Sequence, residues 1–422
     1  MRTPLTLLII SILLLAFDYY CYSAILAVFK KWKPATKKIF STAYWSYTIL
    51  LIIGVFCAIY FQKVLFLSLK SIILVAFFLT VICKLVMLPF LLVDDVRRLA
   101  IKLFRLKKDQ KNKTPSQLKP QTTNEAITRS AFLTKAGLIA AAVPLSSLSW
   151  GILSGAYDYH IKRVKLVLPN LPRAFDGIKL GQISDIHSGS FYNKTAVKGG
   201  IEMLMGEKPD FIFFTGDLVN NLTNEVKDYQ DIFAKLSAPL GVYSTLGNHD
   251  YGDYYFGRTN SPAKAKNLQD MITTHKLMGY DLLMNENRRL KVDGEEIGVL
   301  GIENWGMGRF PKYGKMELAV KNTDDLPVKL LLSHDPSHWR GEVLEKYSDI
   351  DAMFSGHTHG MQFGVRLKEF QWSPVQYIYK EWAGLYQEKQ QQLYVNVGYG
   401  FLGYPGRVGI LPEITIFELR RG

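Results

Sequence analysis

Four long apolar runs occupy most of the first 156 residues of this 422-residue chain, and no other feature constrains its fold as strongly. They cover residues 4–29, 43–61, 71–93 and 136–156. Each is long enough to cross a hydrocarbon core, which takes about 20 helical residues. A single cleaved signal peptide does not explain the first run, because its apolar core would be shorter and further spans follow. We therefore expect a bundle of about four transmembrane helices.

Basic residues orient this bundle. Cytoplasmic loops carry an excess of Lys and Arg, and such an excess follows the first run at residues 30–38 and the third run at residues 97–119. The connection between the second and third runs holds only Lys63 and Lys70. The pattern predicts an integral protein of the cell (inner) membrane, with its N-terminus and residues 157–422 outside the cytoplasm. This orientation depends on the fourth run, since three spans would leave the second half in the cytoplasm.

The charge is divided unevenly between the two parts of the chain. Residues 1–150 carry a net charge of +15 and the remainder carries −1. An enzyme acting on nucleic acid would carry its basic excess on the part that grips phosphates, so no nucleic-acid partner is expected. All three cysteines lie in the apolar runs, which leaves the second half without a disulfide framework or a thiolate zinc site.

These patterns divide the chain into four parts. We expect three transmembrane helices with basic cytoplasmic loops over residues 1–106, a polar linker over 107–128, a fourth transmembrane helix over 129–156, and a folded domain over 157–422. Residues 97–106 alternate basic and apolar side chains at helical spacing. This suits either a helix lying on the anionic inner leaflet or an ordinary charged end to the third span.

Asp18 and Lys84 are charges inside two of the apolar runs, 13 positions after Leu5 and Ser71, which we take as the starts of two parallel spans. An isolated charge at this depth is costly. We expect the two side chains to form an ion pair that joins the first span to the third. The alternative is that the third span is shifted and Lys84 reaches the inner surface.

From residue 161 onward, short β-rich runs alternate with helix-like segments, which indicates an α/β domain. Five of the strands end in side chains that bind metals. They are Asp185 and His187, Asp217, the run Asn248-His249-Asp250, His334, and the pair His357 and His359. The carboxyl ends of strands are where α/β proteins assemble their sites.

The order Asp-x-His, Gly-Asp, Gly-Asn-His-Asp, Ser-His and Gly-His-Thr-His resembles the calcineurin-like metallophosphoesterases over residues 178–400. Within that family the chain looks like its membrane-anchored or exported bacterial phosphodiesterase branch. The resemblance implies a four-layer αββα sandwich of two mixed sheets. One departure is that the family often has two glycines after its last histidine, whereas this chain reads Gly360-Met361.

The resemblance also implies a binuclear metal centre. One metal would be held by Asp185, His187 and His359, the other by Asn248, His334 and His357, with Asp217 bridging them. Nitrogen and oxygen ligands without thiolate suit Mn, Zn or Fe, and Mn is the expected metal with Mg as a further alternative. Two such ions would activate a bridging water for in-line attack on a phosphoester.

His249 follows a metal-bound residue, so it is placed either to protonate the leaving group or to stabilise charge on the phosphoryl group. Asp250 would then orient its imidazole, or else act as a carboxylate that caps the turn. Of the remaining histidines, we expect His160 and His275 to have surface or packing roles. His338 is either a packed residue or a partner of the ligand His334.

Aromatic residues are concentrated in residues 370–386 and 398–406. They form either an apolar substrate rim close to the membrane or the core of two packed sheets. The complete ligand set predicts a phosphoesterase for phosphodiester or pyrophosphate bonds, with membrane lipids and an envelope or lipid-linked substrate as its partners. The alternatives are a phosphatase for nucleotides or sugar phosphates outside the cytoplasm, and a ligand-sensing membrane protein without catalysis.

Overall fold

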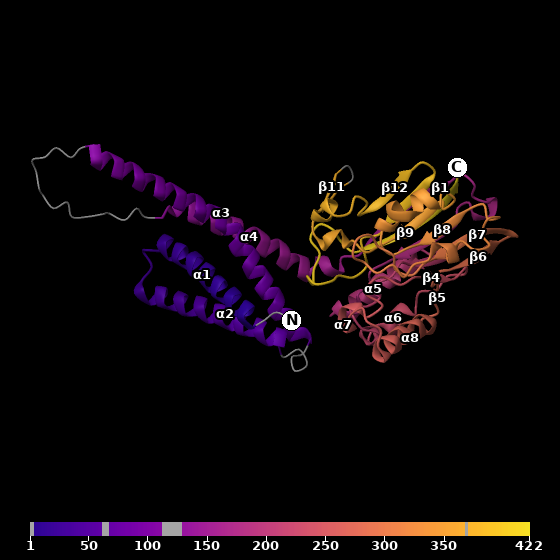
Figure 1. Ribbon diagram of the computed structural model, residues 1–422, viewed down its shortest axis with the longest axis horizontal. Coiled ribbons are helices and arrows are strands. Elements are labelled where there is room, and N and C mark those ends of the chain that lie inside the picture. The colour runs from indigo at the N-terminus through magenta and orange to yellow at the C-terminus, as the bar shows by residue number, and fades with distance from the viewer. Residues whose placement is uncertain (1–3, 61–66, 112–128, 368–369) are drawn as a thin grey trace, which may run out of the picture. The chain divides into compact units, whose positions relative to one another are not determined.

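The computed structural model describes residues 4–60, 67–111, 129–367 and 370–422. The chain divides into two compact units, Met1–Ser149 and Trp150–Gly422 (Figure 1). Each unit is described by itself below.

The first unit is built from long apolar helices. They are α1 (Pro4–Val28), α2 (Pro34–Tyr60), α3 (Leu67–Lys111) and α4 (Ala131–Leu153), which continues into the second unit. All four are long and apolar enough to cross a membrane, so the expected spans have their helices. The first residues of the predicted linker belong to α3, and residues 112–128 lie outside the described part of the chain. The basic stretch at residues 97–106 is helical and continues α3.

The two buried charges of the bundle form the expected ion pair. Lys84 donates to the Asp18 carboxylate, and the Tyr44 hydroxyl donates to the same oxygen over 3.2 Å. The side chains of Asp18 and Lys84 are only 9% and 16% exposed. The pair joins α1 to α3 and confirms the first of the two interpretations, because Lys84 is held by Asp18.

The first sheet of the second unit contains six strands in the order β1-β14-β2-β3-β4-β5. The C-terminal strand β14 runs parallel to β1 and antiparallel to β2, and the strands from β2 to β5 are parallel. Their bounds are β1 (His160–Leu168), β14 (Glu413–Arg421), β2 (Lys179–Ile183), β3 (Phe211–Phe214), β4 (Val242–Ser244) and β5 (Asp281–Leu282).

The second sheet also has six strands, in the order β12-β13-β9-β8-β7-β6. Strands β13, β9, β8 and β7 are parallel, and antiparallel strands lie at both edges. Their bounds are β12 (Gly384–Glu388), β13 (Gln391–Val395), β9 (Ala352–Ser355), β8 (Lys329–Leu332), β7 (Glu295–Gly301) and β6 (Glu286–Val292). A separate hairpin joins β10 (Val365–Arg366) to β11 (Gln371–Trp372).

Short helices complete the unit. They are α5 (Lys194–Gly206), α6 (Gln230–Phe233), α7 (Asp253–Phe256), α8 (Pro262–Leu277), α9 (Met316–Ala319) and α10 (Leu344–Lys346), the last preceded by a π-helical turn, η5 (Trp339–Val343). Figure 1 shows α5, α6 and α8 together on one side of the unit.

Buried side chains define four layers. Successive residues of a strand point to opposite faces, so Phe213 packs between the two sheets, against Phe354, with ring centroids 5.1 Å apart. Its neighbour Phe214 belongs to a core shared with α5, α6 and α8. On the far side, Leu331 of β8 packs with residues of α9 and η5. The expected αββα sandwich of two mixed sheets is therefore confirmed.

The Asp18–Lys84 pair leads to a testable prediction. Asp18→Asn and Lys84→Met should each destabilise the bundle by about 3 to 5 kcal/mol, because each leaves one buried charge without its partner. The double variant should lose much less than the sum of the two. Thermal unfolding of the full chain in detergent measures all three losses. Additive losses would show that the two charges are not coupled.

Candidate metal centre

The predicted ligands lie where the parallel strands of both sheets end. Asp185 follows β2, Asp217 follows β3 and Asn248 follows β4 in the first sheet, while His334 follows β8 and His357 follows β9 in the second. The strands β2, β3 and β4 are neighbours in the first sheet, and β8 and β9 are neighbours in the second. The fold thus brings together ligands that are spread over residues 185 to 359 of the chain.

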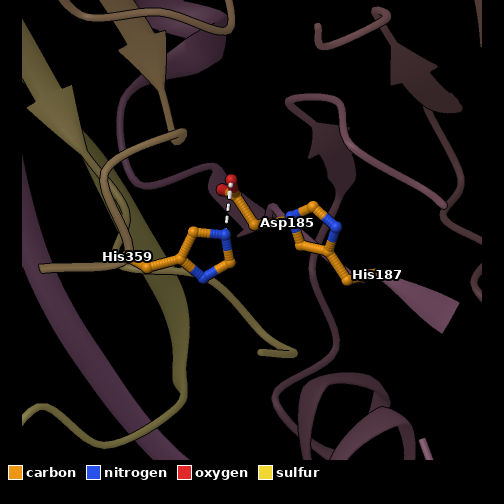
Figure 2. A group of neighbouring side chains, drawn as sticks. All are labelled: Asp185, His187 and His359. Atoms are coloured by element: carbon orange, nitrogen blue, oxygen red, sulfur yellow. Dashed lines mark ion pairs between the residues drawn. The ribbon is translucent and has the colours of Figure 1, made fainter. Parts of the chain in front are cut away.

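A first group contains Asp185, His187 and His359, whose donor atoms lie within 4.8 Å of one another (Figure 2). All three are buried, and Asp185 Oδ1 is 3.3 Å from His359 Nε2. His187 Nδ1 lies 3.0 Å from Asn220 Oδ1 and donates to it, which turns Nε2 inward. Within the described chain, His187 Nε2 and His359 Nε2 are buried without a hydrogen-bond partner. Buried donor atoms left in this way fit a cation.

A second group contains Asp217, His334 and His357. His334 Nδ1 donates to the Thr215 carbonyl over 2.7 Å, so its Nε2 faces the group. That Nε2 lies 3.3 Å from His357 Nδ1, which is 2.8 Å from Asn248 Oδ1. Ring nitrogens and an amide oxygen that converge in this manner match the nitrogen and oxygen donor set of a divalent ion.

Asp217 belongs to both groups. Its Oδ2 lies 3.5 Å from His187 Nε2 in the first group and 3.2 Å from His334 Nε2 in the second. Its other oxygen, Oδ1, accepts the backbone amide of His249 over 2.9 Å, which fixes the carboxylate. This is the position that a bridging ligand requires. Together the two groups form a site for two divalent ions.

Burial controls the charge of these ligands. It lowers the pKa of His187 to about 3 and holds the pKa of His359 well below its usual range. Both imidazoles are therefore neutral, as metal ligation requires. Burial also raises the pKa of Asp185 to about 7, with the charge of Asp217 raising it further while His334 lowers it. Bound cations would favour the ionised carboxylate.

The backbone at the ligands is strained. Asp185, His187, Asp217, His357 and His359 all have φ between 49° and 71°. Residues with a Cβ enter this region rarely and at a cost of roughly 1 to 3 kcal/mol each. Such strain persists where the surrounding structure imposes it, and it is concentrated at functional sites.

Two glycines allow the strand ends to approach one another. A Cβ on Gly247 would collide with the Asp217 carboxylate, and one on Gly356 would collide with Asp185. Neither glycine has a positive φ. Their role is therefore close approach, whereas Gly216, at φ 92°, supplies the tight turn before Asp217.

The prediction that the Asp250 carboxylate orients the His249 imidazole is wrong. The Asp250 carboxylate accepts the backbone amides of Asp217, Leu218 and Gly247 over 2.8 to 2.9 Å, so it fastens two ligand loops together. His249 Nδ1 instead donates to the Asn220 carbonyl over 2.6 Å. The alternative reading of Asp250 as a carboxylate that caps the turn describes what is observed.

His249 itself lies at the centre. Its ring is 5.0 Å from that of His187 and stacks on Tyr254 at 4.4 Å. Because Nδ1 is occupied by a carbonyl acceptor, Nε2 is the nitrogen left for exchange with a reacting group.

Two residues that contact the ligands were not predicted from the sequence. Asn220 serves His187 with its side chain and His249 with its carbonyl, and only its place three residues after Asp217 could have indicated it. Arg407 is fully buried, and its guanidinium lies 3.2 Å from His359 Nδ1 while donating to the carbonyls of Val397 and Gly400. Its only sequence signal was a basic residue in a glycine-rich segment.

Asp335 and Tyr379 form a second unanticipated pair. Tyr379 Oη lies 2.8 Å from His357 Nε2 and donates to Asp335 over 3.4 Å. Asp335 is fully buried, 3.6 Å from His357 Nε2. Asp335 directly follows the ligand His334, which was the available signal. Tyr379 comes from the aromatic-rich segment and had none.

The other histidines lie away from the two groups. His338 is buried between Ser333 and Glu342, with Nδ1 3.0 Å from Ser333 Oγ, so it packs beside the strand that carries His334. His275 is buried in α8 and contacts Ser244 over 2.9 Å. His160 is exposed and lies near Asp158. The surface and packing roles expected for His160 and His275 agree with these positions.

The aromatic-rich segments divide between the two expected roles. Trp382, Tyr399 and Phe401 are buried in hydrophobic cores. Phe370 and Tyr377 are exposed at 57% and 76%. Core packing therefore accounts for Tyr399 and Phe401, whereas the exposed aromatic side chains Phe370 and Tyr377 flank β11.

Two family models together match most of the chain. Residues 1–156 match a probable calcineurin-like phosphoesterase transmembrane domain, and residues 178–361 match the calcineurin-like phosphoesterase model.

Individual relatives agree with these matches. An uncharacterized metallophosphoesterase, YkuE, of Bacillus subtilis is 30% identical over 59% of this chain and 82% of its own length. A transmembrane protein with a metallophosphoesterase domain from Danio rerio is 26% identical over 64% of this chain, and the match spans 60% of that protein. The UDP-2,3-diacylglucosamine pyrophosphatase LpxG of Chlamydia trachomatis is 25% identical over 60% of this chain and 88% of its own length. The chain is a membrane-associated member of the calcineurin-like metallophosphoesterase family.

Proposed function

We propose that this protein hydrolyses phosphodiester or pyrophosphate bonds of a lipid-linked or envelope substrate, with the centre at Asp217 as its active site. The observation that carries the proposal is the single carboxylate shared by two groups of buried ligands, in a chain with four apolar helices. The Chlamydia relative is named for cleavage of a diacylated sugar nucleotide, which supports a lipid-linked substrate.

Two divalent ions at such a centre lower the pKa of a bound water and neutralise charge on a phosphoryl group. The chain itself supplies their position. Asp217 holds the two ligand groups together, and the carbonyls of Thr215 and Asn220 orient His334 and His249. With Nδ1 of His249 fixed, Nε2 is the atom that would deliver a proton to the leaving oxygen. Mn remains our expected metal, from the ligand chemistry and the family resemblance.

We further propose that the phosphoesterase unit lies outside the cytoplasm. The basic residues at 30–38 and 97–119 support this orientation, because both stretches would flank spans on the inner side. The helix α4 supports it as well, since it provides the fourth crossing that the orientation requires.

Hydrolysis by the full chain in lipid nanodiscs tests the activity. Metal-stripped protein resupplied with Mn, Zn or Mg should cleave a chromogenic phosphodiester faster than the matching monoester. Asp217→Asn should abolish metal-dependent turnover, because it removes the shared charge. His249→Ala should slow a substrate with a poor leaving group by about 10² to 10⁴, and should slow a nitrophenyl ester much less.

Two results would contradict this assignment. Full turnover by Asp217→Asn would remove the shared centre from the mechanism. An equal loss for good and poor leaving groups in His249→Ala would exclude proton donation by that residue.

Asp250→Asn separates structural from chemical roles. The two carboxylate oxygens of Asp250 accept several backbone amides, and an asparagine at this position has only one oxygen to accept them. We therefore expect the free energy of unfolding to fall by about 2 to 4 kcal/mol. Denaturant unfolding in detergent, followed by tryptophan fluorescence, measures it, with His249→Ala as the matched control of near-normal stability. Unchanged stability with lost activity would restore Asp250 as a catalytic residue.

Cysteine labelling tests the orientation. Lys31→Cys and Lys227→Cys place single thiols at exposed positions in a chain whose three native cysteines are replaced by Ala. In spheroplasts, a membrane-impermeant maleimide should label Lys227→Cys at once, and Lys31→Cys only after permeabilisation. The reverse pattern would place the active site in the cytoplasm.

A further inference from the structure

The strand that leads into the β10–β11 hairpin has an unusual distribution of side chains. Phe363, Val365 and Leu367 are 40%, 41% and 67% exposed. Between them, Gly364 is buried and Arg366 is half-buried. Alternate residues of a strand face opposite sides, and a strand at a protein surface normally turns its polar side to water. Here the outward side is apolar and the inward side carries the charge.

Both polar side chains on the inward side of this strand have partners within the protein. Gln362 donates to the carbonyls of Tyr404 and Gly406 over 2.7 and 2.9 Å, and Arg366 pairs with the buried Glu413. The strand therefore cannot turn over to hide its apolar face without leaving buried polar groups unpaired. The outward apolar face is a fixed feature of the fold.

Further exposed apolar side chains extend this face. Val365 pairs with Trp372 across the hairpin, so the two side chains share a side. Phe370 precedes β11, and Tyr377 and Ile378 follow it, at 57%, 76% and 68% exposed. We define the hairpin patch as Met361, Phe363, Val365, Leu367, Phe370, Tyr377 and Ile378.

The patch lies beside the end of the fourth apolar helix. Gly151, in the last turn of α4, accepts the Arg407 amide over 3.1 Å and packs against Val408, where a Cβ would lie 2.6 Å from Val408 Cγ2. Val408 in turn bonds on its other side to Gln362 and Gly364, over 2.8 and 2.9 Å. Val408 therefore lies between the last turn of α4 and the strand that carries the patch.

The last turn of α4 has the character of a membrane boundary. Trp150 and Leu153 are 69% and 83% exposed. The apolar segment that can cross a membrane extends from Ala131 to Tyr157. Tryptophan is enriched where a span meets the headgroup region. The hairpin patch therefore lies close to the depth at which this span leaves the bilayer.

We propose that the hairpin patch is a second membrane contact, inserted between the headgroups and acyl chains of the bilayer that α4 crosses. Soluble surfaces rarely expose contiguous apolar patches beyond a few hundred Å². Interfacial elements bury such faces roughly 5 to 10 Å into the boundary region, with aromatic side chains among their anchors. A lipid surface is the occupant that continuity with α4 favours. A second copy of the chain or another protein would be a different outcome of the test.

This contact has a consequence for the metal centre, which rests on the proposed function. Ser373, directly after β11, donates to the carbonyl of Gly360, the residue that follows His359. Tyr379, directly after Ile378, lies 2.8 Å from His357 Nε2. Insertion of the patch would hold the ligand loop at headgroup depth. The matching substrate is a phosphoester whose phosphate lies in the headgroup layer.

Depth-dependent quenching tests the contact. Leu367→Cys and Ile378→Cys carry a bimane label in the full chain with Cys21, Cys57 and Cys83 replaced by Ala. The chain is placed in nanodiscs of phosphatidylcholine and phosphatidylglycerol with or without shallow doxyl-labelled lipid. Leu277→Cys is the matched control, because Leu277 is also a leucine 67% exposed, on α8. We expect strong lipid quenching at 367 and 378 and none at 277.

Equal quenching at all three positions, or none at 367 and 378, would overturn the proposal. The second result would show that the patch does not contact lipid, and would leave a second copy or another protein as its occupant to be tested. Because this readout needs no turnover, it remains valid if the enzyme proves inactive in every assay.

Activity provides an independent measurement. In Leu367→Ser and Ile378→Ser, hydrolysis of a water-soluble diester should be unchanged. Hydrolysis of a phospholipid diester in the same nanodiscs should fall about tenfold, because the ligand loop would no longer be held at headgroup depth. An equal fall for both substrates would indicate damage to the centre and would count against the contact. Absence of all turnover in the parent chain would refute the proposed function and leave the quenching result to decide the patch.

Discussion

The site depends on one buried carboxylate. Asp217 has an oxygen within 3.5 Å of a histidine from each ligand group, and its other oxygen is fixed by a backbone amide. Burial opposes charge on this group, but the facing His334 and His249 hold its pKa well below the usual range. A buried charge is tolerated only with close partners. The glycines let the ligand loops approach one another closely, and the three amides that donate to Asp250 hold two of these loops together.

The two sheets have different tasks around this carboxylate. The first sheet contributes His187 and three oxygen donors, Asp185, Asp217 and Asn248, and the second contributes the histidines 334, 357 and 359. A site divided in this way is complete only when the sheets pack face to face. The core between them, with Phe213 against Phe354, is therefore as necessary for the centre as the ligands are. Changes in that core should move one half of the ligand set relative to the other.

Several expectations from sequence were correct because their signals are local. A ligand motif directly after an apolar strand needs only a few neighbouring residues to be recognised, and an apolar run of about 20 residues is self-evident. The Asp18–Lys84 pair followed from the cost of isolated charges in a membrane. The role of Asp250 was misjudged for the opposite reason. Although Asp250 is adjacent in sequence to His249, its carboxylate accepts the amides of residues 217 and 218, 33 and 32 positions earlier, just after the neighbouring strand β3.

The sequence by itself determined the family, the apolar helices and the identity of the ligands, since each depends on residue type and short spacing. Only the tertiary structure decided which oxygen of Asp217 faces both groups, that Asn220, Arg407 and Tyr379 support the histidines, and that β14 inserts between β1 and β2. It also revealed that the strand after His359 turns its apolar side outward. These features depend on contacts between residues far apart in the chain, and such contacts are set by packing, which leaves no local pattern in the sequence.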